Sequence, residues 1–367
     1  MDRKKWGGVR RILMFSTLGI IIFFGAVQSE ASNSGIRATF PEPITVLFPS
    51  IIHMEQRPVV WRMATEYPVT SMPGEGLVIF AQEVTARTHG AIVPQLIFDT
   101  DTEFNSSQMP EAIRNGKLEV GDAFGGALGE NDPLFLLSSL PFTATSVSKA
   151  RRLADMSRAE YVRAFEAQGL HLLYITPWPP TGLWSRNPVE TIDDLRGLFV
   201  RTYDETSAEV IKATGAFAES LSFSEAIPRL AEGEINAVLS SGDGGAGRKL
   251  WNYLPYFTAI GYAVPLSFTA VNADTWLALT REQQEAVTNA AKVTEDRQWE
   301  RLNTRLAENA SRMRENGVAI QNNPSPVVQM VLHEASMGAV AAWQSRVGER
   351  GDNLLKAYLA QEALTLD

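Results

Sequence analysis

Short apolar runs alternate with helically spaced apolar residues along most of the chain. Runs of this kind predict buried strands, whereas apolar residues three and four positions apart predict amphipathic helices. The expected strands are 44–50, 92–98, 120–124, 170–175, 183–186, 198–201, 237–239 and 267–272. The expected helices are 73–89, 106–115, 147–168, 205–213, 223–232 and 281–315. This alternation of strand and helix predicts an α/β fold.

Three further segments refine this pattern. Residues 51–71 are irregular, and we expect a long loop there, a feature that is often functional. The sequence Pro-Trp-Pro-Pro at 177–180 is excluded from a central strand, so we expect a domain crossing near it. A capping box at 280–283 begins the last helix, which at about 1.5 Å per residue spans about 52 Å, enough to cross two domains. Its second half carries an apolar stripe formed by Trp299, Leu302, Leu306 and Met313.

The N-terminus has the three parts of a secretory signal peptide. Five basic residues precede an apolar run at 12–27, and Ser29-Glu30-Ala31 supplies a small-x-small exit. The alternative is a membrane anchor, but the run is shorter than the roughly 20 residues that a spanning helix needs. We therefore expect a cleaved signal at 1–31, a disordered leader at 32–43, and a periplasmic protein.

Composition excludes several classes of function. The 367 residues include no cysteine, which excludes disulfides, thiolate metal sites and a lipid-anchored N-terminal cysteine. The net charge is −9 and becomes −12 once the signal, whose net charge is +3, is removed. Such an acidic protein is a poor partner for nucleic acid or for an anionic membrane surface. The chain has room for two domains.

Motifs for metal, nucleophilic or nucleotide chemistry are weak. The four histidines show no ligand spacing, and no G-x-S-x-G motif occurs, so we predict no metal, no cofactor and no catalytic triad. Residues 242–247 match G-x-G-x-x-G but lack the acidic residue that a dinucleotide site needs about 20 positions later. The alternatives for this segment are a flexible loop or a loop that lines a ligand cleft. A periplasmic hydrolase using Asp243 as a base is the enzymatic rival.

Arg201 is the strongest single candidate for ligand binding. It ends a predicted strand, and ligands of open α/β sheets lie beyond the carboxyl ends of strands. Its guanidinium can hold a carboxylate through two hydrogen bonds, although a solvated surface arginine is the alternative at this position. Trp178 and Trp184 flank the expected crossing and favour either interface packing or an aromatic cleft wall.

Several segments in order resemble the solute-binding subunit of tripartite ATP-independent periplasmic (TRAP) transporters, the DctP-like family. The most specific is Ile192-Asp193-Asp194-Leu195-Arg196-Gly197-Leu198-Phe199-Val200-Arg201, which is similar to the family signature I-x-D-L-x-G-L-K-x-R. Weaker matches lie at 80–92, 115–122, 140–142 and 223–233. The similarity covers about 44–320.

The resemblance implies a two-lobe periplasmic binding protein with a hinge, crossing strands and a long helix that spans both lobes. Lobe I would comprise 44–175 with about 264–295, and lobe II 176–263 with about 296–367 and shared C-terminal helices. The signature arginine of the family binds the ligand carboxylate, which implies this role for Arg201. The aromatic residue of the following segment implies Phe223, and the polar residue after the next strand implies Ser240 or Ser241. The other candidates for the ligand site are Gly242, Thr181, Trp178, Trp184, Phe124 and Tyr67.

Departures from the family pattern bear on the ligand. Sialic acid binders carry a second arginine where this chain has Thr181, which argues against sialate. The small residues at 240–245 predict a wider wall, and the tryptophans add aromatic surface. We therefore expect a bulky or aromatic monocarboxylate, with a C4-dicarboxylate or sugar acid as alternatives.

The resemblance also implies partners. The expected ones are the small and large membrane subunits of a TRAP permease, and the receptor itself is expected to be a monomer. A receptor that presents its ligand to a sensor kinase is a further alternative.

Overall fold

The computed structural model describes residues 58–364. The predicted signal at 1–31, the leader at 32–43 and the strand at 44–50 lie outside the described residues. Within them, no helix has both the length and the hydropathy that crossing a membrane requires.

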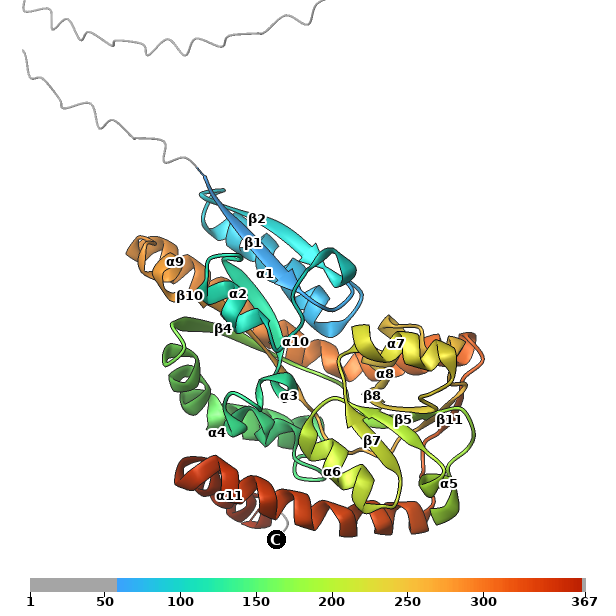
Figure 1. Cartoon of the computed structure of the whole chain (residues 1–367). Helices are drawn as coiled ribbons and strands as arrows, with labels where there is room; N and C mark the ends of the chain where they lie inside the picture. The colour runs from blue at the N-terminus through green and yellow to red at the C-terminus, as the bar shows by residue number, and fades with distance from the viewer. Residues whose placement is uncertain (1–57, 365–367) are drawn as a thin grey trace, which may run out of the picture. The chain divides into compact units, whose positions relative to one another are not determined.

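Two mixed β-sheets form the framework of this part of the chain (Figure 1). In the first sheet β1 is parallel to both β2 and β3, while β10 runs antiparallel to β3 and β4. Its order is β2 (Ile92–Phe98), β1 (Val59–Thr65), β3 (Val120–Phe124), β10 (Leu266–Asn272) and β4 (Leu170–Pro177). The second sheet has the order β11 (Ala319–Gln321), β9 (Tyr256–Thr258), β5 (Thr181–Ser185), β8 (Ala237–Ser241), β6 (Phe199–Thr202) and β7 (Phe217–Ser220).

Helices begin and end where the local sequence provides caps. Ser222 and Thr280 form capping boxes at the starts of α7 and α10, and Gly233 ends α7 with a φ of 82°. The helices are α1 (Met72–Arg87), α2 (Met109–Arg114), α3 (Gly125–Leu128), α4 (Val147–Glu166), α5 (Ile192–Arg196), α6 (Glu205–Ala213), α7 (Phe223–Glu232), α8 (Gly242–Gly247), α9 (Ala273–Leu277), α10 (Arg281–Glu315) and α11 (Pro326–Leu364). Short 3₁₀ turns occupy η1 (Asp99–Asp101), η2 (Pro133–Ser139) and η3 (Leu250–Asn252).

The described chain passes between the sheets three times, through α9 and α10 and through two short segments. Residues 178–180 lead from β4 to β5, and residues 259–265 return from β9 to β10. They lie side by side, because Trp178 N donates to Pro265 O at 2.9 Å and Thr181 N donates to Ala263 O at 2.8 Å. The chain therefore changes sheets at the Pro-Trp-Pro-Pro segment, as its proline content predicts.

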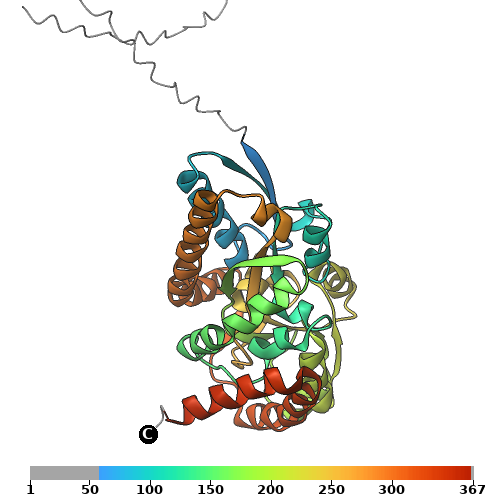
Figure 2. The same ribbon diagram turned by 90° about the vertical axis from the view of Figure 1, so that its left-hand side faces the viewer.

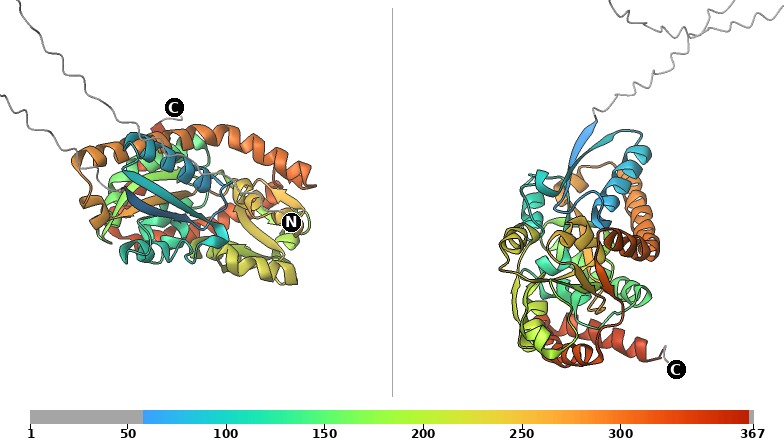
Figure 3. Two further views of the ribbon diagram at one scale, coloured as in Figure 1. Left: turned by 90° about the horizontal axis from the view of Figure 1, so that it is seen from above. Right: turned by 90° about the vertical axis from the view of Figure 1, so that its right-hand side faces the viewer.

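Helices α10 and α11 each contact elements of both sheets. Helix α10 packs on helix α1 and strand β4 at the first sheet, and on helix α8 and strand β11 at the second sheet. Figure 3 shows α10 in orange running past both sheets. Helix α11 lies against α4 and α6 (Figure 2) and is kinked at Gly348, whose φ of 72° is not helical. The predicted two-lobe α/β architecture with a long shared helix is confirmed.

Three details of the predicted pattern are wrong. The expected loop at 51–71 contains strand β1, which is buried in its second half. The expected loop at 242–247 is helix α8, capped by the Ser241 side chain. Leu306 does not belong to the apolar stripe of α10, because it is 41% exposed while Trp299, Leu302 and Met313 are buried.

A carboxylate is buried within the first sheet. Asp122 on β3 is 1% exposed, and its two oxygens accept hydrogen bonds from Thr65 Oγ1 at 3.0 Å and Thr269 Oγ1 at 3.3 Å. Burial raises the pKa of Asp122 to about 7. The hydrogen bonds from the two hydroxyls lower this pKa, but they offset only part of the effect of burial. The folded protein therefore binds this proton more tightly than the unfolded chain, in which an aspartate has a pKa of about 3.9.

The stability of the protein is expected to depend on Asp122 between about pH 4 and pH 7. Because the folded-state pKa is raised, the stabilisation is complete below about pH 4 and is lost as the pH rises through 7. Asp122→Asn should remove this loss, so that its free energy of unfolding exceeds the wild type by up to about 4 kcal/mol at pH 8. Urea denaturation at pH 4, 6 and 8 measures this, and the pH 4 pair serves as the control because both side chains are then neutral. Parallel pH profiles for the two proteins would contradict the prediction.

Candidate ligand-binding site

A pocket opens beside the two connecting segments, at the carboxyl ends of β3 and β6. About 350 Å³ in and above the pocket is free of protein atoms, and part of this space is open solvent. Open α/β sheets bind their ligands at the carboxyl ends of their strands. The lining residues are Tyr67, Phe124, Trp178, Thr181, Arg201, Tyr203, Phe223, Ser240, Ser241, Gly244 and Pro265.

Arg201 supplies the charge in this pocket. The residue is 6% exposed, its Nε donates to Leu221 O at 2.6 Å, and its guanidinium carbon lies 4.2 Å from the ring centroid of Phe223. Burial lowers the pKa of Arg201 to about 10, an effect opposed by Tyr67 and Glu66. The side chain is therefore still a cation at neutral pH.

The guanidinium of Arg201 has no ion-pair partner among residues 58–364. Its two Nη atoms likewise make no hydrogen bond to these residues. A buried cation without a counterion is costly unless something compensates it. The pocket therefore offers an anion a strong, directional binding group.

Aromatic rings form the walls. The Trp178 ring lies edge-to-face with Tyr67 at 4.7 Å and with Phe124 at 6.3 Å between centroids, and Phe124 meets Tyr203 in the same way at 5.3 Å. The Trp178 indole is held in place because its Nε1 donates to Ser267 Oγ at 3.0 Å. Rings that are fixed before binding lose little conformational freedom when a ligand arrives.

Small polar residues line the remaining side. Thr181 begins β5 directly opposite Ser241, which ends β8 after Ser240. Ser241 Oγ accepts from Gly244 N at 3.1 Å, so this hydroxyl caps α8. A Cβ on residue 244 would lie 2.6 Å from Ser240 Oγ, which explains why a glycine is needed there.

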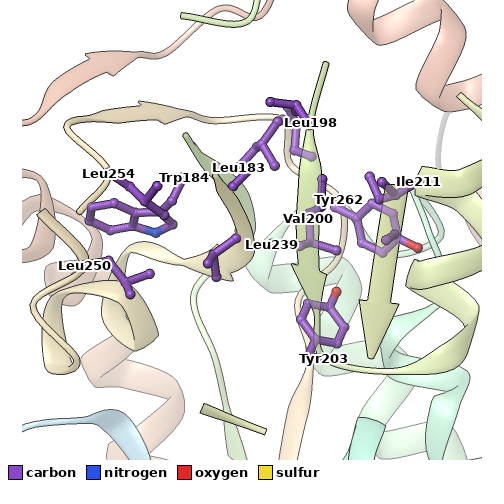
Figure 4. Packing of buried hydrophobic residues seen from close by; sticks show 14 of the residues in the cluster. Leu183, Trp184, Leu198, Val200, Tyr203, Ile211, Leu239, Leu250, Leu254 and Tyr262 are labelled. Carbon is purple, nitrogen blue, oxygen red and sulfur yellow. The ribbon is translucent and has the colours of Figure 1, made fainter. Parts of the chain in front are cut away.

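The structure brings together eight of the ten sequence-predicted residues, and two do not line the pocket. Trp184 is fully buried in the second sheet, where it packs among Leu239, Leu250 and Leu254 (Figure 4). Gly242 faces α10, and a Cβ there would lie 3.2 Å from the Met313 side chain.

Of the small residues at 240–245, Ser240, Ser241 and Gly244 line the pocket, whereas Gly242 and Gly245 do not. The Trp184 ring occupies the space that a side chain on Gly245 would need. This glycine and Gly242 therefore make room for the protein's own side chains rather than for a ligand.

Asp243, the carboxylate of the hydrolase alternative, is outside the pocket lining. It is fully buried, and its oxygens accept from Met72 N at 2.8 Å, Arg305 Nε at 2.5 Å and Asn309 Nδ2 at 3.2 Å. A carboxylate held in this way acts as a structural counterion and is not available to activate water.

Sequence reasoning missed the outer part of the site. Here Glu66, Ser106, Asp204, Glu205 and Glu225 surround the mouth, next to Arg201 and Tyr203. Asp204 could have been found, because it stands three residues after Arg201 and immediately before a helix, the usual position of a capping residue. The described residues contain no cluster of acidic or histidine side chains fit to hold a metal ion.

The family model described as bacterial extracellular solute-binding protein, family 7, matches residues 63–343. The chain belongs to this DctP family. Its members are solute receptors of TRAP transporters, which is a family of transport proteins and not of enzymes. The family predicted from the signature ending at Arg201 is thereby confirmed.

Individual relatives agree with this assignment. A crystal structure of the DctP-type receptor DctP7 from Bordetella pertussis, described as binding pyroglutamic acid, is 28% identical with a TM-score of 0.78, over 82% of this chain and 99% of that one. A solute-binding protein of Chromohalobacter salexigens is 25% identical over 63% of this chain and 70% of its own length. The ectoine/5-hydroxyectoine-binding periplasmic protein UehA of Ruegeria pomeroyi is 24% identical over 83% and 91%.

Proposed function

We propose that this DctP-family receptor captures a small organic carboxylate in the periplasm through a salt bridge to Arg201 and delivers it to the membrane subunits of a TRAP permease. The observation that carries the proposal is the buried guanidinium of Arg201, which forms no salt bridge within residues 58–364 and lines the pocket. A ligand carboxylate would supply the negative charge and accept hydrogen bonds from the free N–H groups of the guanidinium in a bidentate arrangement.

The pocket walls bear on the body of the ligand. Trp178, Phe124 and Tyr67 present ring surfaces, while Thr181 and Ser240 provide the nearby hydroxyls. These walls favour a compact monocarboxylate with a flat apolar or ring-shaped body over an extended sugar acid. The pyroglutamic acid named for the Bordetella pertussis relative is a compact cyclic carboxylate of this kind.

Contacts across the mouth of the pocket support a closing mechanism. Arg248, at the end of α8, donates to Glu66 O at 2.6 Å and forms an ion pair with Asp99 of η1. These partners belong to opposite lobes if lobe I comprises 44–175 with about 264–295 and lobe II comprises 176–263 with about 296–367. Closure would remove water from the Arg201 salt bridge and strengthen it, since attraction between charges grows as the effective dielectric falls.

Thermal stability in the presence of acids tests the proposal. L-pyroglutamate, L-proline, benzoate, succinate and D-glucuronate are compared with the methyl ester or amide of each. An acid that binds only the folded protein stabilises it by about 2.7 kcal/mol at a concentration 100 times its Kd. We expect at least one acid to raise the melting temperature while its neutral derivative does not. A panel in which no acid acts, or in which the neutral derivatives act equally well, would refute the function.

A further inference from the structure

The outer part of the pocket is acidic although the proposed ligand is an anion. Five acidic side chains line it against two arginines, Arg201 and Arg346. The acidic residues are Glu66, Glu130, Asp204, Glu205 and Glu225. Two of these carboxylates have hydrogen-bond partners, because Glu66 Oε1 accepts from Ser106 N at 2.8 Å and Glu225 belongs to the capping box of α7. Glu205 is exposed to solvent.

Asp204 differs from these residues because half of its carboxylate has no partner. The residue is 3% exposed, and its Oδ1 caps α6 by accepting from Ser207 N at 2.7 Å and Ser207 Oγ at 2.6 Å. Its Oδ2 is buried and makes no hydrogen bond within residues 58–364. Burial raises the pKa of Asp204 to about 6, so the group is still mainly ionised at neutral pH.

Asp204 Oδ2 lies close to Gly126 of α3. A Cβ on residue 126 would lie 2.4 Å from the Phe124 ring and 3.2 Å from Asp204 Oδ2, so glycine at this position leaves space beside the carboxylate. Helix α3 carries no basic residue that could neutralise the carboxylate. A buried acceptor without a donor from the protein is usually satisfied by a water or by a ligand.

Arg201 and Asp204 lie three residues apart at the end of β6, yet they do not pair with one another. At the corresponding end of β8, Asp243 is fully paired with Arg305. The chain can therefore bury a complete ion pair at a strand end, and at β6 it instead keeps two opposite charges apart on the wall of one pocket. A ligand that carries both charges would satisfy both side chains at once.

We propose that the receptor is selective for zwitterions: Arg201 binds the ligand carboxylate, and Asp204 Oδ2 accepts a hydrogen bond from a cationic N–H group of the same ligand. The inference rests on the proposed function and narrows its substrate class to acids with an ammonium, iminium or amidinium group. The acidic side chains around the mouth add a favourable field for that cation.

Calorimetric titration of the full-length protein with matched ligand pairs tests the inference. L-proline is compared with cyclopentanecarboxylate and L-pipecolate with cyclohexanecarboxylate, so that each pair shares its ring and carboxylate and differs in the cationic N–H group. We expect at least one zwitterion to bind tenfold or more tightly than its partner. Asp204→Asn should reduce the ratio of the two affinities by at least tenfold. It should change the affinity for the ring acids less than threefold.

Two controls make the outcomes distinguishable. An asparagine keeps an oxygen that can cap α6, so an unchanged melting temperature shows that the variant is folded. Glu209→Gln neutralises an exposed carboxylate on the same helix α6 that does not line the pocket, and it should change the preference less than twofold. Ring acids that bind as well as the zwitterions, or a preference that survives Asp204→Asn, would overturn the inference and leave the proposed function intact. If the wild type bound none of the acids, both the inference and the proposed function would be refuted.

Discussion

Arg201→Met is expected to weaken binding of the carboxylate ligand by about 2–5 kcal/mol, which is a loss of roughly 30-fold to several thousand-fold in affinity. The reason is that the guanidinium is the cation of the inner pocket, where it is 6% exposed and stacked on Phe223. Methionine fills a similar volume and removes only the charge and its donors. Titration calorimetry with an acid that stabilises the wild type measures the loss, and a change below tenfold would contradict the role of Arg201.

The same substitution should act in the opposite direction on the empty protein. Burial lowers the pKa of Arg201, which means that folding disfavours its charged form. Removing the charge should therefore leave the free energy of unfolding at least as high as in the wild type, and higher by up to about 3 kcal/mol. Weaker binding in a protein that is not less stable distinguishes a ligand contact from a structural one.

Arg229→Met provides a matched control for this experiment. Arg229 also lies over a phenylalanine ring, 5.2 Å from the centroid of Phe199, but it forms ion pairs with Glu219 and Glu234 and lies outside the pocket lining. Replacing it removes an arginine and an aromatic contact of the same kind. We expect its ligand affinity to stay within twofold of the wild type.

Asp243→Ala is expected to lower the free energy of unfolding by about 3–5 kcal/mol, the range found when one partner of a buried ion pair is removed. Asp243 is fully buried and accepts from Arg305 Nε, Asn309 Nδ2 and Met72 N. It thereby joins α8, α10 and the first turn of α1. Without it, the guanidinium of Arg305, itself nearly inaccessible, would lose its closest counterion. Urea denaturation at pH 7 measures the loss.

Two further variants separate the buried pair from an ordinary one. Arg301→Ala breaks the bidentate pair with Glu308 on the more exposed face of the same helix and should cost less than about 1 kcal/mol. The double variant Asp243→Ala/Arg305→Ala removes both buried charges and should be more stable than the sum of the two single losses implies. Equal losses for Asp243→Ala and Arg301→Ala would contradict the structural role of Asp243.

Regular elements with strong local signals could be predicted from the sequence. The limits of β2, β3, α6, α7 and α10 match the predicted ranges, because apolar spacing and capping residues act within a few positions. Strand β1 was missed because Arg62 and Met63 interrupt its β-branched character, and its pairing with β2 and β3 is what places it. Helix α8 was missed because its four glycines oppose a helix. Two of them are required by close packing, Gly242 on Met313 and Gly245 on Trp184.

The sequence by itself determined the family, the alternation of strands and helices, and the choice of Arg201, since each of these depends on residues close together along the chain. Tertiary structure alone decided which side chains share a pocket. Trp178 lines the pocket while Trp184 lies in the core, because Trp184 points to the opposite face of β5 from Thr181, and successive side chains of a strand alternate between faces. Asp204 and Asp243 both follow a strand, yet only Asp243 is paired, because its partner Arg305 comes from a helix 62 residues further along the chain.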